Sequence, residues 1–141
     1  MIICLFTISC QKEKVPVEAK SIDEAYKFII GEWKWEKTES QARGQEIPTV
    51  LTPHSENKTK LFVFKSDKSA VLIENGAEVD HYNFNIATSS QLTGTEHGKN
   101  ELILQLINST DELQTKAYFL IIQRNKMFMS DRLSTTISYY R

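Results

Sequence analysis

The feature that most constrains this chain is a change of periodicity at Gly31. Beyond that residue the helical spacing of apolar residues is lost, and short apolar or alternating segments are separated by turn-forming residues. Asn75-Gly76 is the clearest turn, because both residues tolerate the positive φ angles of a type I′ hairpin. This pattern is typical of antiparallel β-structure with short connections.

Eight strands are expected beyond Gly31, joined by short turns except at the polar segments 40–57 and 88–99. Eight antiparallel strands in chain order predict an up-and-down barrel. A two-sheet sandwich is the alternative, but it needs longer crossover connections, which only those two polar segments could supply. The expected strands cover residues 33–36, 58–65, 69–74, 78–86, 101–107, 113–123, 127–130 and 135–141.

One short helix is expected before the strands. Ser21 and Glu24 have the spacing of a capping box, and the apolar residues that follow recur at helical spacing until Gly31 ends the helix. Segment 113–123 is apolar on both faces, and we expect the helix to cover its outer row. The predicted fold is all-β, an eight-stranded antiparallel up-and-down barrel with a short N-terminal helix, over residues 21–141.

The first ten residues carry no charge, and charged residues begin at Lys12. Ten residues are too few to cross a bilayer as a helix, which takes about 20. The length fits the apolar region of a signal peptide, which has about 7–15 residues. The usual basic region is absent, so either the recorded start is a few residues late or the segment is not a signal peptide. We nevertheless expect residues 1–9 to be a signal peptide and residues 10–20 a charged tether.

The segment Thr7-Ile8-Ser9-Cys10 resembles a bacterial lipobox, although Thr7 replaces the usual leucine. The resemblance implies that a diacylglycerol is attached to the thiol of Cys10, which becomes the mature N-terminus and membrane anchor. An ordinary N-terminal cysteine is the alternative. No cysteine follows Cys10, so the mature chain has no disulfide. The resemblance places the protein in the cell envelope, as an outer-membrane lipoprotein. The next residues, Gln11 to Lys14, resemble a surface-export signal or form a generic charged tether.

The segment Gly31-Glu32-Trp33 resembles the G-x-W signature of the lipocalins. Four later segments, F-V-F-K-S-D, I-E-N-G, F-M-S-D and the terminal Y-Y-R, resemble a small bacterial lipocalin-like lipoprotein domain, over about residues 27–141. The second lipocalin motif, Thr-Asp-Tyr, is missing from its usual place. The resemblance implies a barrel that carries or captures a small apolar or amphipathic molecule. It also implies an arginine stacked on the signature tryptophan, and pairing of the last strand with the first brings Arg141 near Trp33.

The barrel interior is the candidate ligand site. Register across the Asn75-Gly76 hairpin is expected to pair Val71 with Asp80, which turns one apolar face inward. Inward aromatic rings with tyrosine hydroxyls suit a small hydrophobic ligand with a polar end. The alternative is a solid core, with the loops binding a protein or glycan. The expected ligand-lining residues are Trp35, Phe62, Phe64, Ile73, Tyr82, Phe84 and Tyr139.

Composition argues against several other functions. The 17 Lys and Arg balance 18 Asp and Glu, whereas nucleic-acid binders usually have an excess of basic residues. No metal-ligand spacing, glycine-rich phosphate loop or nucleophile motif is present, so no metal, cofactor or catalytic residue is expected. Glu78 and Asp80 share a strand face, but they lie beside the turn, where a solvated rim is expected. The predicted protein is not an enzyme.

Overall fold

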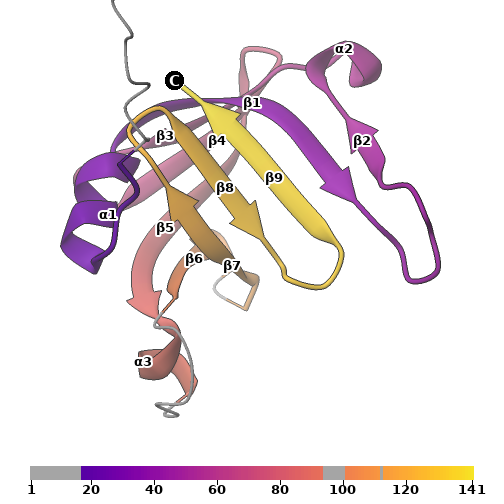
Figure 1. Ribbon diagram of the computed structural model, residues 1–141. Helices are drawn as coiled ribbons and strands as arrows, with labels where there is room; N and C mark the ends of the chain where they lie inside the picture. The colour runs from indigo at the N-terminus through magenta and orange to yellow at the C-terminus, as the bar shows by residue number, and fades with distance from the viewer. Residues whose placement is uncertain (1–16, 94–100, 112) are drawn as a thin grey trace, which may run out of the picture.

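The computed structural model describes residues 17–93, 101–111 and 113–141, which form one antiparallel sheet closed into a barrel (Figure 1). Strands follow one another in chain order, and the first also pairs with the last. The strands are β1 (Gly31–Ser40), β2 (Thr49–Leu51), β3 (Lys60–Phe64), β4 (Ser69–Glu74), β5 (Ala77–Thr88), β6 (Leu102–Asn108), β7 (Thr115–Ile122), β8 (Lys126–Ser130) and β9 (Thr135–Tyr140).

The barrel consists of β1 and β3 to β9. β2 is an additional strand that pairs with the last three residues of β1, Thr38 to Ser40. Closure is direct, because β1 pairs with β9 from Lys34, opposite Tyr140, to Ser40, opposite Thr135. The predicted eight-stranded up-and-down barrel is therefore confirmed. The sandwich alternative is wrong, because a single continuous sheet contains all the strands in sequential order.

Helix α1 (Ile22–Ile29) begins where the sequence predicts it. The Ser21 hydroxyl accepts a hydrogen bond from the Glu24 N–H at 3.2 Å, while the Glu24 carboxylate accepts one from the Lys20 N–H at 2.9 Å. The helix lies against one end of the barrel (Figure 1), and the indole of Trp33 donates to the Ile29 carbonyl at 2.7 Å. The apolar side of α1 thus joins the barrel core from its end.

The expectation that the helix covers the outer row of β7 is wrong. Ile121, in that row, is 48% exposed, whereas Ile122 on the inner row is fully buried. The helix is attached by a short link to the first strand, and its buried residue Ile29 packs with Trp33 at the barrel end. The helix therefore packs at the end of the barrel and does not cover the outer face of β7.

The chain entering α1 is bonded to the barrel. Ala19 is buried, and its N–H donates to the Ile122 carbonyl at 2.9 Å, while Glu18 forms a bridge with Gln123. These residues fall within the predicted tether. The signal segment and Cys10 lie outside the described residues. No helix within the described ranges has both the length and the apolar character needed to cross a membrane.

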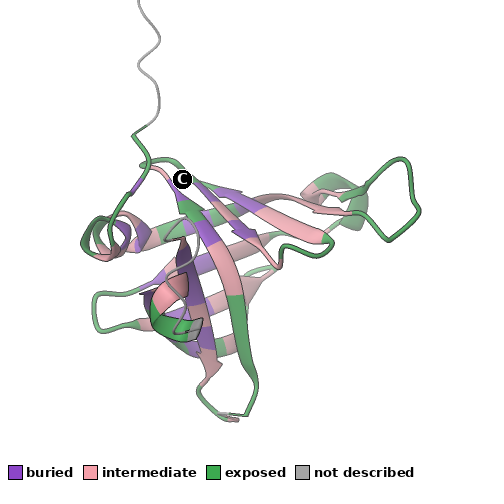
Figure 2. Ribbon diagram, turned by 60° about the horizontal axis from the view of Figure 1, so that its bottom comes forward, coloured by how far each residue is buried: buried purple, intermediate pink, exposed green. Residues whose placement is uncertain are grey.

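The two polar segments contain short elements that the sequence pattern does not predict. Segment 40–57 carries β2 and a one-turn helix, α2 (Pro53–Glu56), and β5 is followed by α3 (Ser89–Thr93). Buried residues are concentrated in the strands of the barrel, and the connections are mostly exposed (Figure 2). The long connections therefore stand outside a core that is built by the strands and α1.

The register of the β4–β5 hairpin differs from the prediction beyond the turn. Val79 is left out of the ladder as a bulge, so Asp80 pairs with Leu72 and not with Val71. Side chains alternate along a strand, so an extra residue reverses the faces beyond it. Leu72 therefore faces the core, and Ile73, predicted to line the interior, lies on the outer face.

Candidate functional site

Six of the seven predicted ligand-lining residues lie inside the barrel. All six are at most 5% exposed. They come from β1, β3 and β5 and from β9, which closes the barrel against β1. They are Trp35, Phe62, Phe64, Tyr82, Phe84 and Tyr139.

Five of these six inward rings, those other than Trp35, are joined by ring contacts. Phe62 lies 4.5 Å from Phe64 between ring centroids, and Phe64 meets Phe84 edge to face at 5.1 Å. Phe62 is also 5.9 Å from Tyr82 and 6.2 Å from Tyr139. Such contacts between aromatic rings stabilise a packed core beyond the burial of their surface. The half of the interior next to α1 is therefore occupied by side chains.

The contact predicted between Arg141 and Trp33 is present at the closed end. The guanidinium lies 4.7 Å from the centroid of the Trp33 ring and donates to the carbonyls of Ile30, at 3.1 Å, and Arg124. Gly31 has a φ of 129°, and a Cβ there would lie 3.4 Å from the Arg141 guanidinium. The glycine of the G-x-W segment thus permits the backbone turn, whose positive φ other residues rarely adopt, while the arginine packs directly against it.

Polar side chains lie at the opposite end of the interior. The Tyr82 hydroxyl donates to Asp80 at 2.9 Å and accepts a hydrogen bond from Lys116 at 3.4 Å. Burial raises the pKa of Tyr82 and Tyr139 well above the usual range of tyrosine, and neighbouring acidic groups add to the effect. Both phenols remain protonated at neutral pH. Tyr139 is 5% exposed, and no fully buried side-chain N or O atom of the described residues lacks a hydrogen-bond partner.

The barrel wall has a seam between β1 and β3. On this side β1 pairs with β3 only up to Lys34 and with β2 only from Thr38 onward. Between these pairings α2 carries the chain away from the ladder. Thr52 begins that turn with a capping box, Pro53 occupies its start, and Asn57 ends it in a left-handed conformation with φ of 48°. Local turn chemistry therefore opens the wall beside Trp35.

A groove of about 360 Å³ lies at this seam, and we call it the seam groove. Its volume is within the range of small-molecule sites. The Lys60 ammonium lies 4.9 Å from the centroid of the Trp35 ring. The groove thus has apolar walls with two cations beside them. Its principal lining residues are Lys34, Trp35, Pro53, Lys60, Leu61, Ile73 and Tyr140.

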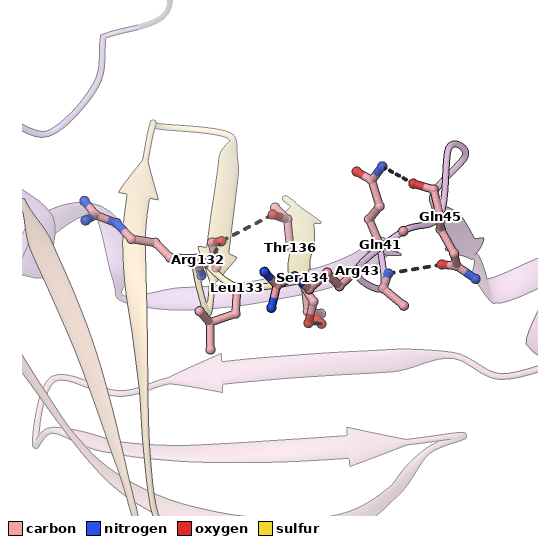
Figure 3. Close-up of a pocket in the computed structure, with 11 residues that line it drawn as sticks. Gln41, Arg43, Gln45, Arg132, Leu133, Ser134 and Thr136 are labelled. Carbon is pink, nitrogen blue, oxygen red and sulfur yellow. Dashed lines mark hydrogen bonds between the residues drawn. The ribbon is translucent and has the colours of Figure 1, made fainter.

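A second groove, of about 400 Å³, lies at the rim between the β1–β2 loop and the β8–β9 turn, and we call it the rim groove (Figure 3). Its lining is mostly polar. Hydroxyl, amide and guanidinium groups come from residues 41–45 on one side and from 130–136 on the other.

The sequence identifies only part of this arrangement. Trp35 and Ile73 were predicted to share a cavity, and they do line the same groove, but Ile73 does so from the outer face. Pro53, Leu61 and Tyr140 were missed because the seam depends on where two ladders end. The Thr52-Pro53 pair is the one local signal of the interruption.

Within the described ranges, no three His, Cys, Asp or Glu side chains come together as a set able to hold a metal ion. Comparisons of the chain with protein-family models, with curated proteins and with solved structures give no match. The lipocalin resemblance thus rests on the motif residues of this chain and on its eight-stranded barrel.

Proposed function

We propose that this protein is a non-enzymatic, membrane-anchored, lipocalin-like lipoprotein that binds a small amphipathic molecule in the seam groove. The observation that carries the proposal is the mostly apolar groove beside Trp35, at a barrel wall whose interior rings are already packed. A ligand of ordinary size finds space at the seam without displacing the core.

The chemistry of the groove supports an amphipathic ligand. Leu61, Ile73 and Pro53 offer apolar surface to a hydrocarbon or aromatic part. Lys34 and Lys60 lie at the same groove and favour an acidic head group. Glu74 lies 3.1 Å from the Lys58 ammonium and 3.6 Å from that of Lys60, so it offsets part of this positive charge.

The anchor part of the proposal is supported by the lipobox-like sequence at Cys10. Replacing Cys10 with Ala tests it by membrane fractionation of the host. We expect the variant to move from the membrane to the soluble fraction. Unchanged membrane association would contradict the lipoprotein assignment.

Ligand binding is tested with 1-anilinonaphthalene-8-sulfonate, an anionic aromatic probe that matches the groove in size and charge. We expect saturable fluorescence enhancement with the native protein. Ile73→Asp places a carboxylate against the apolar wall and should weaken binding about tenfold or more. The matched control is Val79→Asp, because Val79 is a β-branched residue of the same hairpin but is 49% exposed at the bulge and does not line the groove.

Equal weakening by both substitutions, or no saturable binding by the native protein, would contradict the proposal. Near-UV circular dichroism of each variant checks that the barrel is intact. Native mass spectrometry of protein extracted gently from its host then searches for the natural ligand. A bound small molecule in the native protein that is absent from Ile73→Asp would identify it.

A further inference from the structure

We propose that the rim groove is a second binding site, independent of the seam groove, and that it takes an acidic saccharide. The chemistry of its walls differs from that of the seam. The seam groove offers apolar side chains, whereas the rim groove offers hydroxyls, amides and a guanidinium.

The loop that forms one wall is held in a defined conformation. The Gln41 side-chain amide donates to the Gln45 carbonyl at 2.8 Å, and the Gln45 side-chain oxygen accepts from the Ala42 N–H at 3.0 Å (Figure 3). The Gln41 N–H donates to the Ser134 carbonyl at 2.8 Å, which ties this loop to the opposite turn. Such preorganisation lowers the entropic cost of binding.

The opposite wall is held equally well. The Asp131 carboxylate accepts hydrogen bonds from the backbone N–H groups of Leu133, Ser134 and Thr135, each at 2.9 Å. These bonds hold the pKa of Asp131 below its usual range. The carboxylate is thus engaged by the turn, and Asp131 is not among the residues that line the groove.

The Ser130 hydroxyl accepts a hydrogen bond from the Arg132 N–H at 3.1 Å, but the hydrogen bonds that the hydroxyls of the groove donate are long. Thr136 donates to Ser130 at 3.4 Å, and Ser134 donates to Asp131 at 3.5 Å. Hydroxyls both donate and accept, as do the hydroxyls of a sugar. Long bonds of this kind are weak, so a ligand hydroxyl can replace them at low cost. The lining therefore fits a polyhydroxylated molecule.

One cation in the groove has no acidic partner. Arg132 forms an ion pair with Glu101 and lies over the ring of Phe119, with the guanidinium carbon 3.7 Å from the centroid. Arg43, among the described residues, makes no ion pair and lines the groove with the hydroxyls (Figure 3). A guanidinium binds a carboxylate through two parallel hydrogen bonds. The ligand class is therefore a sugar that carries a carboxylate.

The experiment is isothermal titration calorimetry of the full-length chain with digalacturonic acid at low ionic strength, since exposed charges are screened by salt. We expect saturable binding by the native protein. Arg43→Gln should weaken it about tenfold, and Thr136→Val, which removes one hydroxyl at similar volume, should weaken it a few-fold. The matched control is Arg124→Gln, because Arg124 lies in the β7–β8 turn at the opposite end of the barrel.

Two further ligands separate the contribution of the carboxylate from that of the sugar. Maltose lacks the carboxylate and sodium sulfate lacks the sugar, and both should bind at least about tenfold more weakly than digalacturonic acid. Sulfate binding as tightly as the saccharide would overturn the assignment, as would equal binding by Arg43→Gln or no binding by the native protein. Ile73→Asp should keep full saccharide affinity, because Ile73 lines the seam groove and not the rim groove. Failure of the seam-groove proposal would therefore leave this test unaffected.

Discussion

The two ends of the barrel are built on different principles. At the end covered by α1, Ile29 and Trp33 are completely buried, and Arg141 closes the joint through contacts with ring and backbone. At the open end the strands stop at different heights, and grooves lined by partly exposed side chains remain. The closed end should tolerate few substitutions, because its buried side chains are closely packed.

This difference assigns the stability of the fold mainly to the closed end, and the proposed ligand binding to the open end and the seam. A ligand site needs surface whose polar and apolar groups are not already used by the fold, and the open end and the seam both offer such surface. The closed end supplies the rigid frame on which those surfaces are held. Substitutions at the two ends should therefore differ first in their effect on the free energy of unfolding.

The largest effect is expected for Phe64→Ala at the closed end. Phe64 is 1% exposed and touches two other rings, so its removal should lower the free energy of unfolding by about 3–5 kcal/mol. Leu133→Ala at the open end is the control, because Leu133 is 90% exposed and should change stability by less than about 0.5 kcal/mol. Urea denaturation measures both. Similar values for the two variants would contradict the proposed division of the barrel.

The closed end is also the part that the sequence predicts best. Ser21 marks the start of the helix, Gly31 marks its end, and alternation around Trp33 places the tryptophans inside. Each of these signals acts over a few residues. Closure of the barrel then predicts that Arg141 lies near Trp33, because the last strand must pair antiparallel with the first.

The open end is predicted less well because its geometry depends on the exact number of residues in a strand and on where strand pairing ends. The alternation of apolar and polar residues does not reveal either. One extra residue at Val79 moves Ile73 from the inner to the outer face. The seam arises because the β3 ladder stops at Lys34 and the β2 ladder begins at Thr38. Neither feature changes the hydrophobic pattern, so the sequence shows which residues are apolar but not which groove they line.

A smaller loss is expected for Arg141→Ala. The variant removes a cation–π contact with Trp33 and two hydrogen bonds to backbone carbonyls, and it should lower the free energy of unfolding by about 1–2 kcal/mol. Arg141→Lys keeps the charge but not the planar fork, and should recover only part of the loss. Full recovery by lysine would show that charge alone closes this end.

Asp131→Ala should cost about 1 kcal/mol at the rim, because its carboxylate holds three backbone N–H groups of an exposed turn. We expect the effect to be local. Hydrogen exchange should speed up at Ser134 and Thr135 while core amides such as that of Leu104 keep their protection. Faster exchange throughout the barrel would instead show that the rim and the core unfold together.

The smallest effect is expected from Glu74→Gln, and its value lies in its pH dependence. A hydrogen bond from Lys58, together with the charges of Lys60 and Lys58, holds the pKa of Glu74 below its usual range. Because the pKa is lower in the folded state, the charged form stabilises the fold at pH values above the unfolded pKa, and this contribution is lost as the pH falls through the folded pKa.

The three side chains are 24–39% exposed, so solvent screening limits the contribution to less than about 1 kcal/mol. Melting temperatures of the native protein and Glu74→Gln should differ slightly at pH 7 and converge at the acid end of the titration. Added salt should reduce the difference at pH 7. A difference that persists below both pKa values would mean that Glu74 acts by packing, and that the open end is held together in the same way as the closed one.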